Sequence, residues 1–303
     1  MPGGFSSSMR TIRIGTRGSR LALAQTTLVK AALEKAHPES VFEVRVVKTT
    51  GDILADAPLE SIGGKGVFVK ELESRLLMGE IDLAVHSLKD MPSTCPMGLG
   101  IAAYLEREDP RDMLFSREGY SLEELPEQAR VGTSSLRRIC QLKALKPHVT
   151  CVPIRGNVPT RLGKIGPDLD AVILAAAGVK RLGLAPGSPI DTAAMIPSPG
   201  QAVIAVQARE EDQEANSLAQ SLDHALTRRC AEAERSFLAT LGADCRIPAG
   251  AHAVIDQGRL FMVAMIGNNE GTRIERMTRH GDSPDIGRLL AEDLLDRFYG
   301  DGR

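Results

Sequence analysis

Four short polar turns carry the side chains of this sequence that could do chemistry. Each turn follows an apolar stretch and includes Arg or Lys. In open α/β sheets, ligands bind beyond the carboxyl ends of the strands, and a helix that begins there offers unpaired N–H groups to an anion. One such turn could be a simple helix cap, but four of them favour a shared anion-binding cleft. The turns are Thr16-Arg-Gly-Ser19, His86-Ser-Leu-Lys-Asp90, Thr133-Ser-Ser-Leu-Arg-Arg138 and Arg155-Gly-Asn157, the last followed by Arg161.

The positive charge of the chain is concentrated in residues 130–181. This segment holds six Arg and four Lys against two Asp, a net charge of +8 in a chain whose total is −2. The excess of Arg favours carboxylate or phosphate partners, which accept its forked hydrogen bonds. A solvated basic face is the alternative. It is disfavoured because these arginines stand beside Gly, Ser, Thr and Asn rather than along a helical stripe.

Asp90 is the one acid among these basic turns, directly after Lys89 at the end of an apolar stretch. It could cap a helix or pair with Lys89, or it could act in a reaction. The residues alone leave these alternatives open. His86 is expected to pack or to cap rather than to act.

The five cysteines are odd in number, scattered, and without the spacing of a disulfide framework or a metal site. Cys245 differs from the others because it lies in a loop, Gly242-Ala-Asp-Cys-Arg-Ile-Pro248, between a helix and strands. The neighbouring Arg246 favours its thiolate, and Asp244 opposes it. Small buried side chains are expected at the cysteines in helix and strand patterns, Cys140, Cys151 and Cys230.

Hydrophobic patterning predicts the elements that hold these turns. Strands and helices alternate over the first two hundred residues, which implies parallel sheets with helices on both faces. A strand at 203–207 follows a Pro-rich link, so it could return to the first sheet and make the second domain an insertion. Beyond residue 228 the pattern is that of a small α+β domain with hairpin turns at 256–258 and 267–269. The other predicted strands are 11–16, 41–49, 81–85, 130–132, 149–154, 171–175, 253–255, 260–266 and 274–278, and the predicted helices are 21–36, 67–78, 135–145, 230–241 and one after residue 284.

Several classes of protein are disfavoured. Aromatic residues make up 3% of the chain, Trp is absent and the net charge is −2, which argues against a nucleic-acid partner. No turn matches a nucleotide P-loop. The most apolar stretch, 171–179, is too short to cross a bilayer. We therefore expect a cytoplasmic protein with no membrane and no nucleic-acid partner.

Taken together, these stretches resemble the porphobilinogen deaminase (hydroxymethylbilane synthase) family, in family order over nearly the whole chain. The matching motifs are Arg13-Ile-Gly-Thr-Arg-Gly-Ser19 with Leu21-Ala-Leu23, Gly63-Gly-Lys-Gly-Val-Phe-Val-Lys-Glu71, Ala84-Val-His-Ser-Leu-Lys-Asp90, Glu108-Asp-Pro-Arg-Asp112, Val131-Gly-Thr-Ser-Ser-Leu-Arg-Arg138, Arg155-Gly-Asn-Val-Pro-Thr-Arg161, Ala177-Gly-Val-Lys-Arg-Leu-Gly183 and the Cys245 loop. Ala202, Ala243-Asp244 and Ala24 depart from the commoner pattern of Gly, paired Gly and Trp.

The resemblance implies an α/β fold with two periplasmic-binding-protein-like lobes, the second inserted in the first, and a small C-terminal α+β domain. The first lobe is expected at residues 9–108 and 202–226, the second, with the basic cleft, at 109–201, and the domain with the cofactor cysteine at 227–303. A monomer is expected.

The resemblance also implies a transferase of porphyrin biosynthesis. Such an enzyme condenses four porphobilinogen units onto a covalent dipyrromethane cofactor, releases ammonia, and frees linear hydroxymethylbilane by hydrolysis. It implies dipyrromethane on Cys245, catalysis by Asp90 and no metal. The implied cofactor-binding residues are Lys89, Thr133, Ser134, Ser135, Arg137, Arg138 and Arg155, and the implied substrate-binding residues are Arg17, Ser19, Arg161 and Arg181.

The chemistry fits the composition, because each pyrrole brings an acetate and a propionate that arginines can neutralise. The alternative is a non-catalytic anion-binding two-lobe protein, since paired α/β lobes also make solute receptors. Such a receptor would need neither Asp90 nor Cys245.

Overall fold

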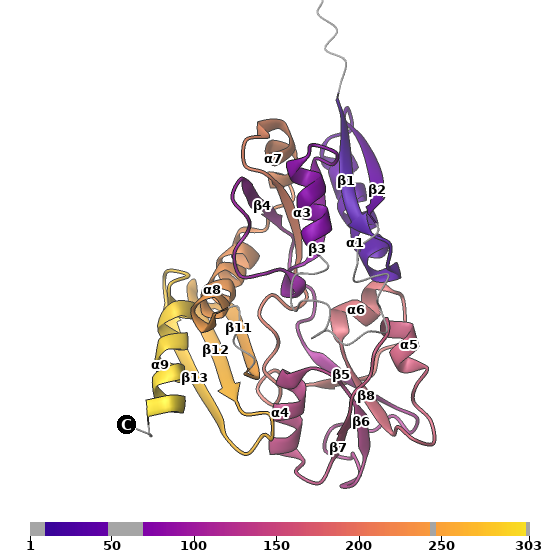
Figure 1. Ribbon diagram of the computed structural model, residues 1–303, viewed down its shortest axis with the longest axis vertical. Helices are drawn as coiled ribbons and strands as arrows, with labels where there is room; N and C mark the ends of the chain where they lie inside the picture. The colour runs from indigo at the N-terminus through magenta and orange to yellow at the C-terminus, as the bar shows by residue number, and fades with distance from the viewer. Residues whose placement is uncertain (1–9, 48–68, 243–246, 301–303) are drawn as a thin grey trace, which may run out of the picture.

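The computed structural model describes residues 10–47, 69–242 and 247–300, which form two α/β lobes and a C-terminal domain beside them (Figure 1). The chain completes most of the first lobe, crosses to the second, and crosses back before it enters the C-terminal domain.

The first lobe is built on a five-stranded sheet with strand order β2-β1-β3-β10-β4. Strand β1 pairs in parallel with β2 and β3, while β10 runs antiparallel to β3 and β4. Its elements are β1 (Thr11–Arg17), α1 (Arg20–Ala36), β2 (Val41–Val47), α3 (Lys70–Leu77), β3 (Leu83–Ser87), the short 3₁₀ turn η2 (Leu88–Asp90), β4 (Leu99–Tyr104), β10 (Ile204–Arg209) and α7 (Gln213–Gln220).

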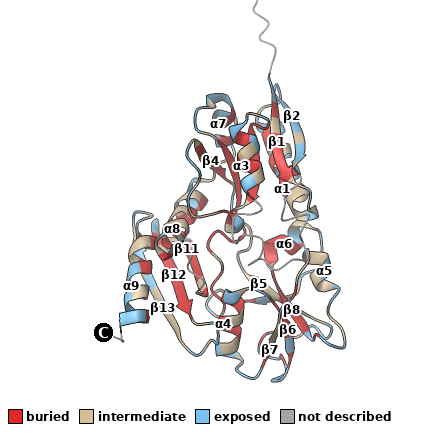
Figure 2. Ribbon diagram, viewed as in Figure 1, coloured by how far each residue is buried: buried red, intermediate tan, exposed pale blue. Residues whose placement is uncertain are grey.

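Helices cover both faces of this first sheet. On one face, Val29 and Leu33 of α1 and Ala215 and Ala219 of α7 pack in one cluster with strand side chains. On the other face, a second cluster joins α3 to the opposite side of β3. Alternate side chains of a strand point to opposite faces, so both faces of each central strand are buried (Figure 2).

The second lobe repeats this plan with the strand order β7-β6-β8-β5-β9. Strand β6 pairs in parallel with β7 and β8, and β5 runs antiparallel to β8 and β9. Helix α4 packs on one face, and α5 and α6 pack on the other. Its elements are β5 (Asp112–Ser116), β6 (Arg130–Gly132), α4 (Leu136–Leu145), β7 (Thr150–Val152), α5 (Val158–Leu162), β8 (Ala171–Ala175), α6 (Ala176–Arg181) and β9 (Ser188–Ile190).

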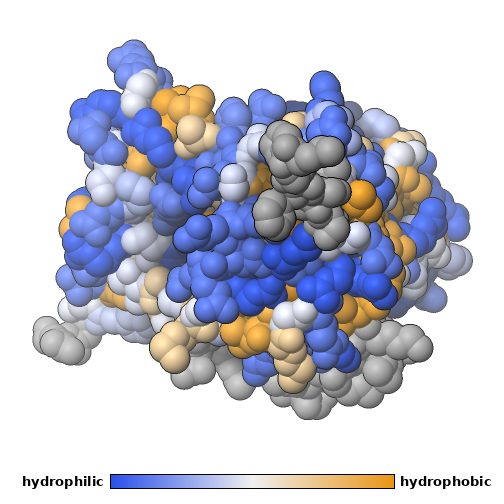
Figure 3. Space-filling model, turned by 90° about the horizontal axis from the view of Figure 1, so that it is seen from above, coloured by the Kyte–Doolittle hydropathy of each residue, from blue (hydrophilic) through white to orange (hydrophobic). Residues whose placement is uncertain are grey.

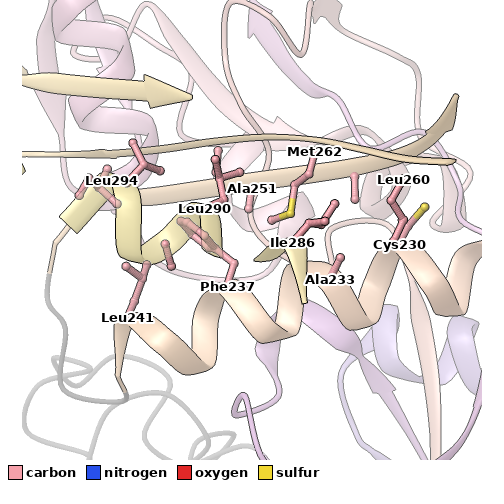
Figure 4. Packing of buried hydrophobic residues seen from close by; sticks show 14 of the residues in the cluster. Cys230, Ala233, Phe237, Leu241, Ala251, Leu260, Met262, Ile286, Leu290 and Leu294 are labelled. Carbon is pink, nitrogen blue, oxygen red and sulfur yellow. The ribbon is translucent and has the colours of Figure 1, made fainter. Parts of the chain in front are cut away.

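The C-terminal domain has two helices on one face of an antiparallel sheet ordered β11-β12-β13. Phe237 and Leu290 come from the two helices and meet Met262 of the sheet in its core (Figure 4). The opposite face brings Met265 against Cys140 of the second lobe. Its elements are α8 (Ala225–Leu241), β11 (Ala249–Asp256), β12 (Arg259–Gly267), β13 (Ile274–Gly281) and α9 (Ile286–Gly300).

The predicted fold class is confirmed, including the insertion of the second lobe, because β10 returns to the first sheet. The expectation of parallel sheets is wrong in part. Strands β5 and β10 each enter a sheet directly from the other lobe, without a crossover helix on that sheet, and both run antiparallel to their neighbours. The residue limits of the three domains stay a prediction.

Polar side chains cover most of the face that is seen from above (Figure 3). Within the described ranges, no helix is both long and apolar enough to cross a membrane, and no group of His, Cys, Asp or Glu could hold a metal ion.

Candidate active site

The first lobe presents two of the predicted turns at one edge of its sheet. Strands β1 and β3 are parallel, so the residues after their carboxyl ends lie at the same edge. Arg17 ends β1, and Ser19 caps α1 by accepting a hydrogen bond from the Ala22 amide at 3.3 Å. The Ser19 hydroxyl is therefore the N-cap of α1, which is the alternative to a ligand-binding turn that was considered for these turns.

Lys89 and Asp90 form the other turn, η2. The amide of Leu88 donates to Val203 O at 3.0 Å, which fixes the turn to the chain that enters β10. Lys89 is half-buried, and burial lowers the pKa of its ammonium to about 8, although the nearby carboxylates of Asp90 and Asp112 oppose this shift. Asp90 is exposed, and its side chain makes no hydrogen bond or ion pair with the described part of the chain. It is thus not a helix cap here.

Arg137 and Arg138 lie in the first turn of α4 in the second lobe and are both buried. Each donates to a different oxygen of Asp112, at 2.8 Å from Arg137 Nη2 and 2.7 Å from Arg138 Nη2. Their Nη1 atoms donate to the carbonyls of Ile196 and Ile173, at 2.7 and 2.9 Å. The pair of arginines is therefore held rigidly, with its guanidinium forks turned inward.

Asp112 is a functional residue that the sequence argument missed. Its side chain has no exposed surface, and burial alone would raise the pKa of its carboxyl group. Arg137 and Arg138 outweigh burial and hold this pKa well below its usual range. An acid at the start of a strand, in the matched motif Glu108-Asp-Pro-Arg-Asp112, was the available signal.

The turn before α4 has three hydroxyl groups, of which two make hydrogen bonds that hold the turn. Thr133 Oγ1 accepts from the Ser135 amide at 3.2 Å. Ser134 Oγ donates to Ile154 O at 2.8 Å and accepts from Ile154 N at 3.0 Å, which ties this turn to the chain after β7. Ser135 is the N-cap residue of α4, but its side chain makes no capping hydrogen bond. Of the three hydroxyls, that of Ser135 is the one without a hydrogen bond to the described part of the chain.

Arg155 and Arg161 flank a tight turn after β7. Arg161 Nε donates to Gly156 O at 2.7 Å, and burial lowers the pKa of Arg161, with further lowering by Arg138 and Arg155. Gly156 has φ +108°, and a Cβ there would lie 2.6 Å from Thr160 Cγ2. Arg155 makes no hydrogen bond or ion pair with described residues. A side chain at Gly156 would therefore displace the turn whose carbonyl binds Arg161.

Arg181 is engaged at the border of the lobes. Its Nη2 donates to the carbonyl of Ala202 at 2.6 Å. Burial lowers the pKa of Arg181, and the carboxylate of Glu108 opposes the shift. Ala202 is one of two described non-glycine residues with positive φ, at +71°.

Charged side chains of the two lobes lie close enough to influence one another. Lys89 of the first lobe is close enough to Arg137 and Arg138 of the second to feel their charge. Arg161 of the second lobe likewise feels the charge of Asp90 of the first. The structure thus places the charges of Lys89, Asp90, Arg137, Arg138 and Arg161 near one another, and Asp90 is the exposed acid among these five residues.

Cys245 lies outside the described residues, as do Ala243 and Asp244. Helix α8 ends at Leu241, and Gly242 follows it with φ +85°. The attachment of the cofactor to Cys245 stays a prediction. Cys140 and Cys230 are buried as expected, and Cys151 is half-buried.

Comparison with known proteins gives matches over nearly the whole chain. Residues 12–217 match the family model described as porphobilinogen deaminase, dipyromethane cofactor binding domain, and residues 228–296 match the model of its C-terminal domain. The chain belongs to the porphobilinogen deaminase family. A porphobilinogen deaminase of Roseiflexus sp. (strain RS-1) is 47% identical over 293 residues, 95% of this chain and 97% of its own. That of Syntrophomonas wolfei is 47% identical over 295 residues, 95% of this chain and 96% of its own.

Solved structures are more distant. The BenM effector-binding domain with its effector benzoate is 14% identical to this chain and has a TM-score of 0.44. The match covers 70% of this chain and 90% of the BenM domain. The VFT2 domain of BvgS from Bordetella pertussis is 16% identical, with 76% and 92% covered and a TM-score of 0.41. These values carry no functional argument.

The predicted family, the transferase of porphyrin biosynthesis and the dipyrromethane cofactor are confirmed by the family and relative matches. The site residues fit such a cofactor. Arg138 Nε is buried without a hydrogen-bond partner in the described part of the chain, and a buried unpaired donor is costly unless a ligand satisfies it. Together with Lys89, Ser135 and Arg155, it forms a donor set suited to carboxylates.

Proposed function

We propose that this enzyme condenses four porphobilinogen units, with loss of ammonia from each, onto a dipyrromethane held by Cys245, and then releases linear hydroxymethylbilane by hydrolysis. One observation carries the proposal. Among the described residues of the site, Asp90 is the exposed acid, on the turn that follows β3, and its charge acts on Lys89 of its own lobe and on Arg161 of the other. A site for carboxylated pyrroles needs cations for the carboxylates and an anion for the positive charge that develops during the reaction.

The basic residues bind and orient. Lys89, Ser135, Arg138 and Arg155 would hold the acetate and propionate groups of the cofactor, while Arg17, Ser19, Arg161 and Arg181 would hold those of the substrate and the growing chain. Arg137 acts through Asp112, which fixes Arg138 beside it. Thr133 and Ser134 keep the turn in place. When bound, the dipyrromethane supplies the pyrrole carbon to which the first unit is added.

Asp90 would act on the reacting pyrrole. Its carboxylate can accept a hydrogen bond from a pyrrole N–H and stabilise the positive charge that grows as ammonia leaves. The exposed position of Asp90 also allows it to take a proton from the pyrrole carbon and pass it to solvent.

We further propose a cytoplasmic monomer. Both lobes of the candidate site come from one chain, so no second copy is needed to complete it. The described cysteines, Cys95, Cys140, Cys151 and Cys230, are free thiols, which suits a reducing compartment.

Intact-mass measurement of Cys245→Ala tests the attachment site. We expect the wild-type chain to carry a covalent adduct, and Cys245→Ala to carry none and to have no turnover. Cys151→Ala, which replaces another thiol that is half-buried, should keep both the adduct and activity. An adduct on a different cysteine, or an active enzyme without an adduct, would show that the attachment site is wrong.

A further inference from the structure

A buried carboxylate outside the candidate site joins all three parts of the molecule. Glu234 lies in α8 of the C-terminal domain, and its side chain has no exposed surface. Its Oε1 accepts from Arg107 Nη2 at 2.9 Å and from the Ala253 amide at 2.8 Å. Its Oε2 accepts from the Gly200 amide at 2.7 Å.

The two residues that Glu234 binds outside its own domain lie on the two crossovers between the lobes. Arg107 stands between β4 and β5, and Gly200 stands between β9 and β10. Arg107 also donates from Nη1 to Gln201 O at 3.0 Å, and its amide donates to Thr227 Oγ1 of α8 at 3.0 Å. One carboxylate therefore fastens both crossovers to the same helix.

The second crossover reaches the Lys89-Asp90 turn directly. Gly200 has φ +73°, and a Cβ there would lie 2.8 Å from Leu88 Cγ and 3.1 Å from Lys89 N. The Gly200 backbone thus packs against this turn without room for a side chain. A shift of Gly200 would be transmitted by contact to Leu88 and Lys89, and along the chain to Asp90.

The same crossover reaches the arginine pair through Gln201. Its Nε2 donates to Asp112 Oδ1 at 2.9 Å and to Pro110 O at 2.8 Å. Asp112 in turn holds Arg137 and Arg138. A continuous set of short hydrogen bonds therefore leads from α8 to the cations of the second lobe.

Packing alone does not require a charge at this position. Burying a carboxylate costs several kcal/mol before its partners compensate, and an apolar side chain of similar volume often serves as well. What a carboxylate adds is a pair of acceptors that bind groups on different segments. At Glu234 these groups belong to both crossovers and to β11.

We propose that Glu234 is a positioning residue that fixes the two crossovers against α8, and thereby sets the place of the Lys89-Asp90 turn relative to the arginine pair. The inference rests on the proposed function in one respect, namely that this turn and this pair act on the same bound pyrroles.

Glu234→Gln tests the inference, because it keeps the side-chain volume but sets an amide N–H against the N–H donors of one crossover.

Asp82→Asn is the matched control. Asp82 is equally buried and binds Arg10, Arg13 and Arg209, but it lies before β3, at the opposite edge of the sheet from Asp90. Hydrogen–deuterium exchange, kcat and KM are measured for both variants at a temperature where each is folded.

We expect Glu234→Gln to speed amide exchange in residues 105–111 and 197–203 and in the 88–91 turn, and to lower kcat at least about 10-fold, since small misplacements of reacting groups are expensive. Asp82→Asn should keep kcat within about twofold of wild type while it lowers stability. A Glu234→Gln enzyme with wild-type kcat per folded molecule, or with faster exchange only in α8 and β11, would overturn the inference.

Two further variants keep the test decisive. If Glu234→Gln does not fold, Arg107→Lys replaces it, because an ammonium keeps the charge but cannot bridge Glu234 and Gln201 O as the guanidinium does. The same predictions and the same contrary outcomes then apply. Asp90→Asn is measured alongside: normal turnover there would refute the proposed function, whereas its loss together with normal turnover of Glu234→Gln would refute only this inference.

Discussion

At the scale of single residues, Asp112 fixes the orientation of the arginine pair. Each guanidinium gives one nitrogen to Asp112 and another to a backbone carbonyl. The Nε atom of Arg138 is buried and has no hydrogen-bond partner in the described chain. The pair therefore adds fixed positive charge to the candidate site.

Ala202 is strained, and its replacement is expected to stabilise the protein. Its φ of +71° lies in the left-handed region, which costs a residue with a Cβ about 1–2 kcal/mol. Glycine avoids this cost but loses more entropy on folding. We expect Ala202→Gly to raise the free energy of unfolding by about 0.5–1 kcal/mol in urea denaturation.

Ala239→Gly is the control for Ala202→Gly. Ala239 is exposed in α8, where glycine is unfavourable, so this variant should lose about 1 kcal/mol. If both variants lose stability to the same degree, the backbone of Ala202 is not strained.

The contacts of a residue could be predicted from sequence only where its partners are close to it in the chain. The Ser19 cap and the Gly-dependent turn beside Arg161 follow from neighbouring residues. The partners of Arg137 and Arg181 do not, because Asp112 and Ala202 are distant in sequence and approach them only when the lobes form.

At the scale of elements, the turn between β7 and α5 sets the geometry of two arginines. Gly156→Ala would place a methyl group 2.6 Å from Thr160 Cγ2 at a φ of +108°. We expect the turn to shift, to move Arg161 from the Gly156 carbonyl, and to lower kcat/KM at least about 10-fold. Steady-state kinetics with porphobilinogen measures this.

Gly163→Ala provides the comparison within the same segment. Gly163 has an ordinary φ of −65°, and the nearest atom to a Cβ there would be Pro159 O at 3.5 Å. This variant should keep kcat/KM within about twofold. A surface substitution without steric conflict usually changes the free energy of unfolding by less than about 0.5 kcal/mol, so the turn should keep its place. Equal losses for both variants would mean that the turn does not position Arg161.

Periodic elements were predictable because one stretch of sequence determines each of them. The Gln257–Gly258 hairpin has the positive φ values that its turn residues indicate, and β11 and β12 flank it as expected. Strands β4, β5 and β9 were not predicted. The antiparallel direction of β5 and β10 depends on how the chain crosses between lobes, which periodicity does not report.

At the scale of the whole molecule, the site exists only where the lobes face each other. Asp90 and Lys89 come from the first sheet, and the arginines with which they interact come from the second. The crossovers between the lobes are held by the C-terminal domain through Glu234. The division into lobes was predictable from the sequence, whereas this three-way contact was not, because its residues are scattered over the chain.

The central claim is that Asp90 acts in the chemistry of this shared site. Single-turnover ammonia release from porphobilinogen by Asp90→Asn, measured beside thermal unfolding, tests it most directly. Asp168→Asn is the control, because that acid is 96% exposed and paired only loosely with Arg130, at 3.8 Å. Asp90→Glu should retain part of the activity, since it keeps the charge but moves it.

We expect Asp90→Asn to unfold at the wild-type temperature and to release ammonia slower by about 10²-fold or more, as the loss of a preorganised charge implies. Asp168→Asn should release it at the wild-type rate. An Asp90→Asn protein that releases ammonia at the wild-type rate per folded molecule would contradict the account.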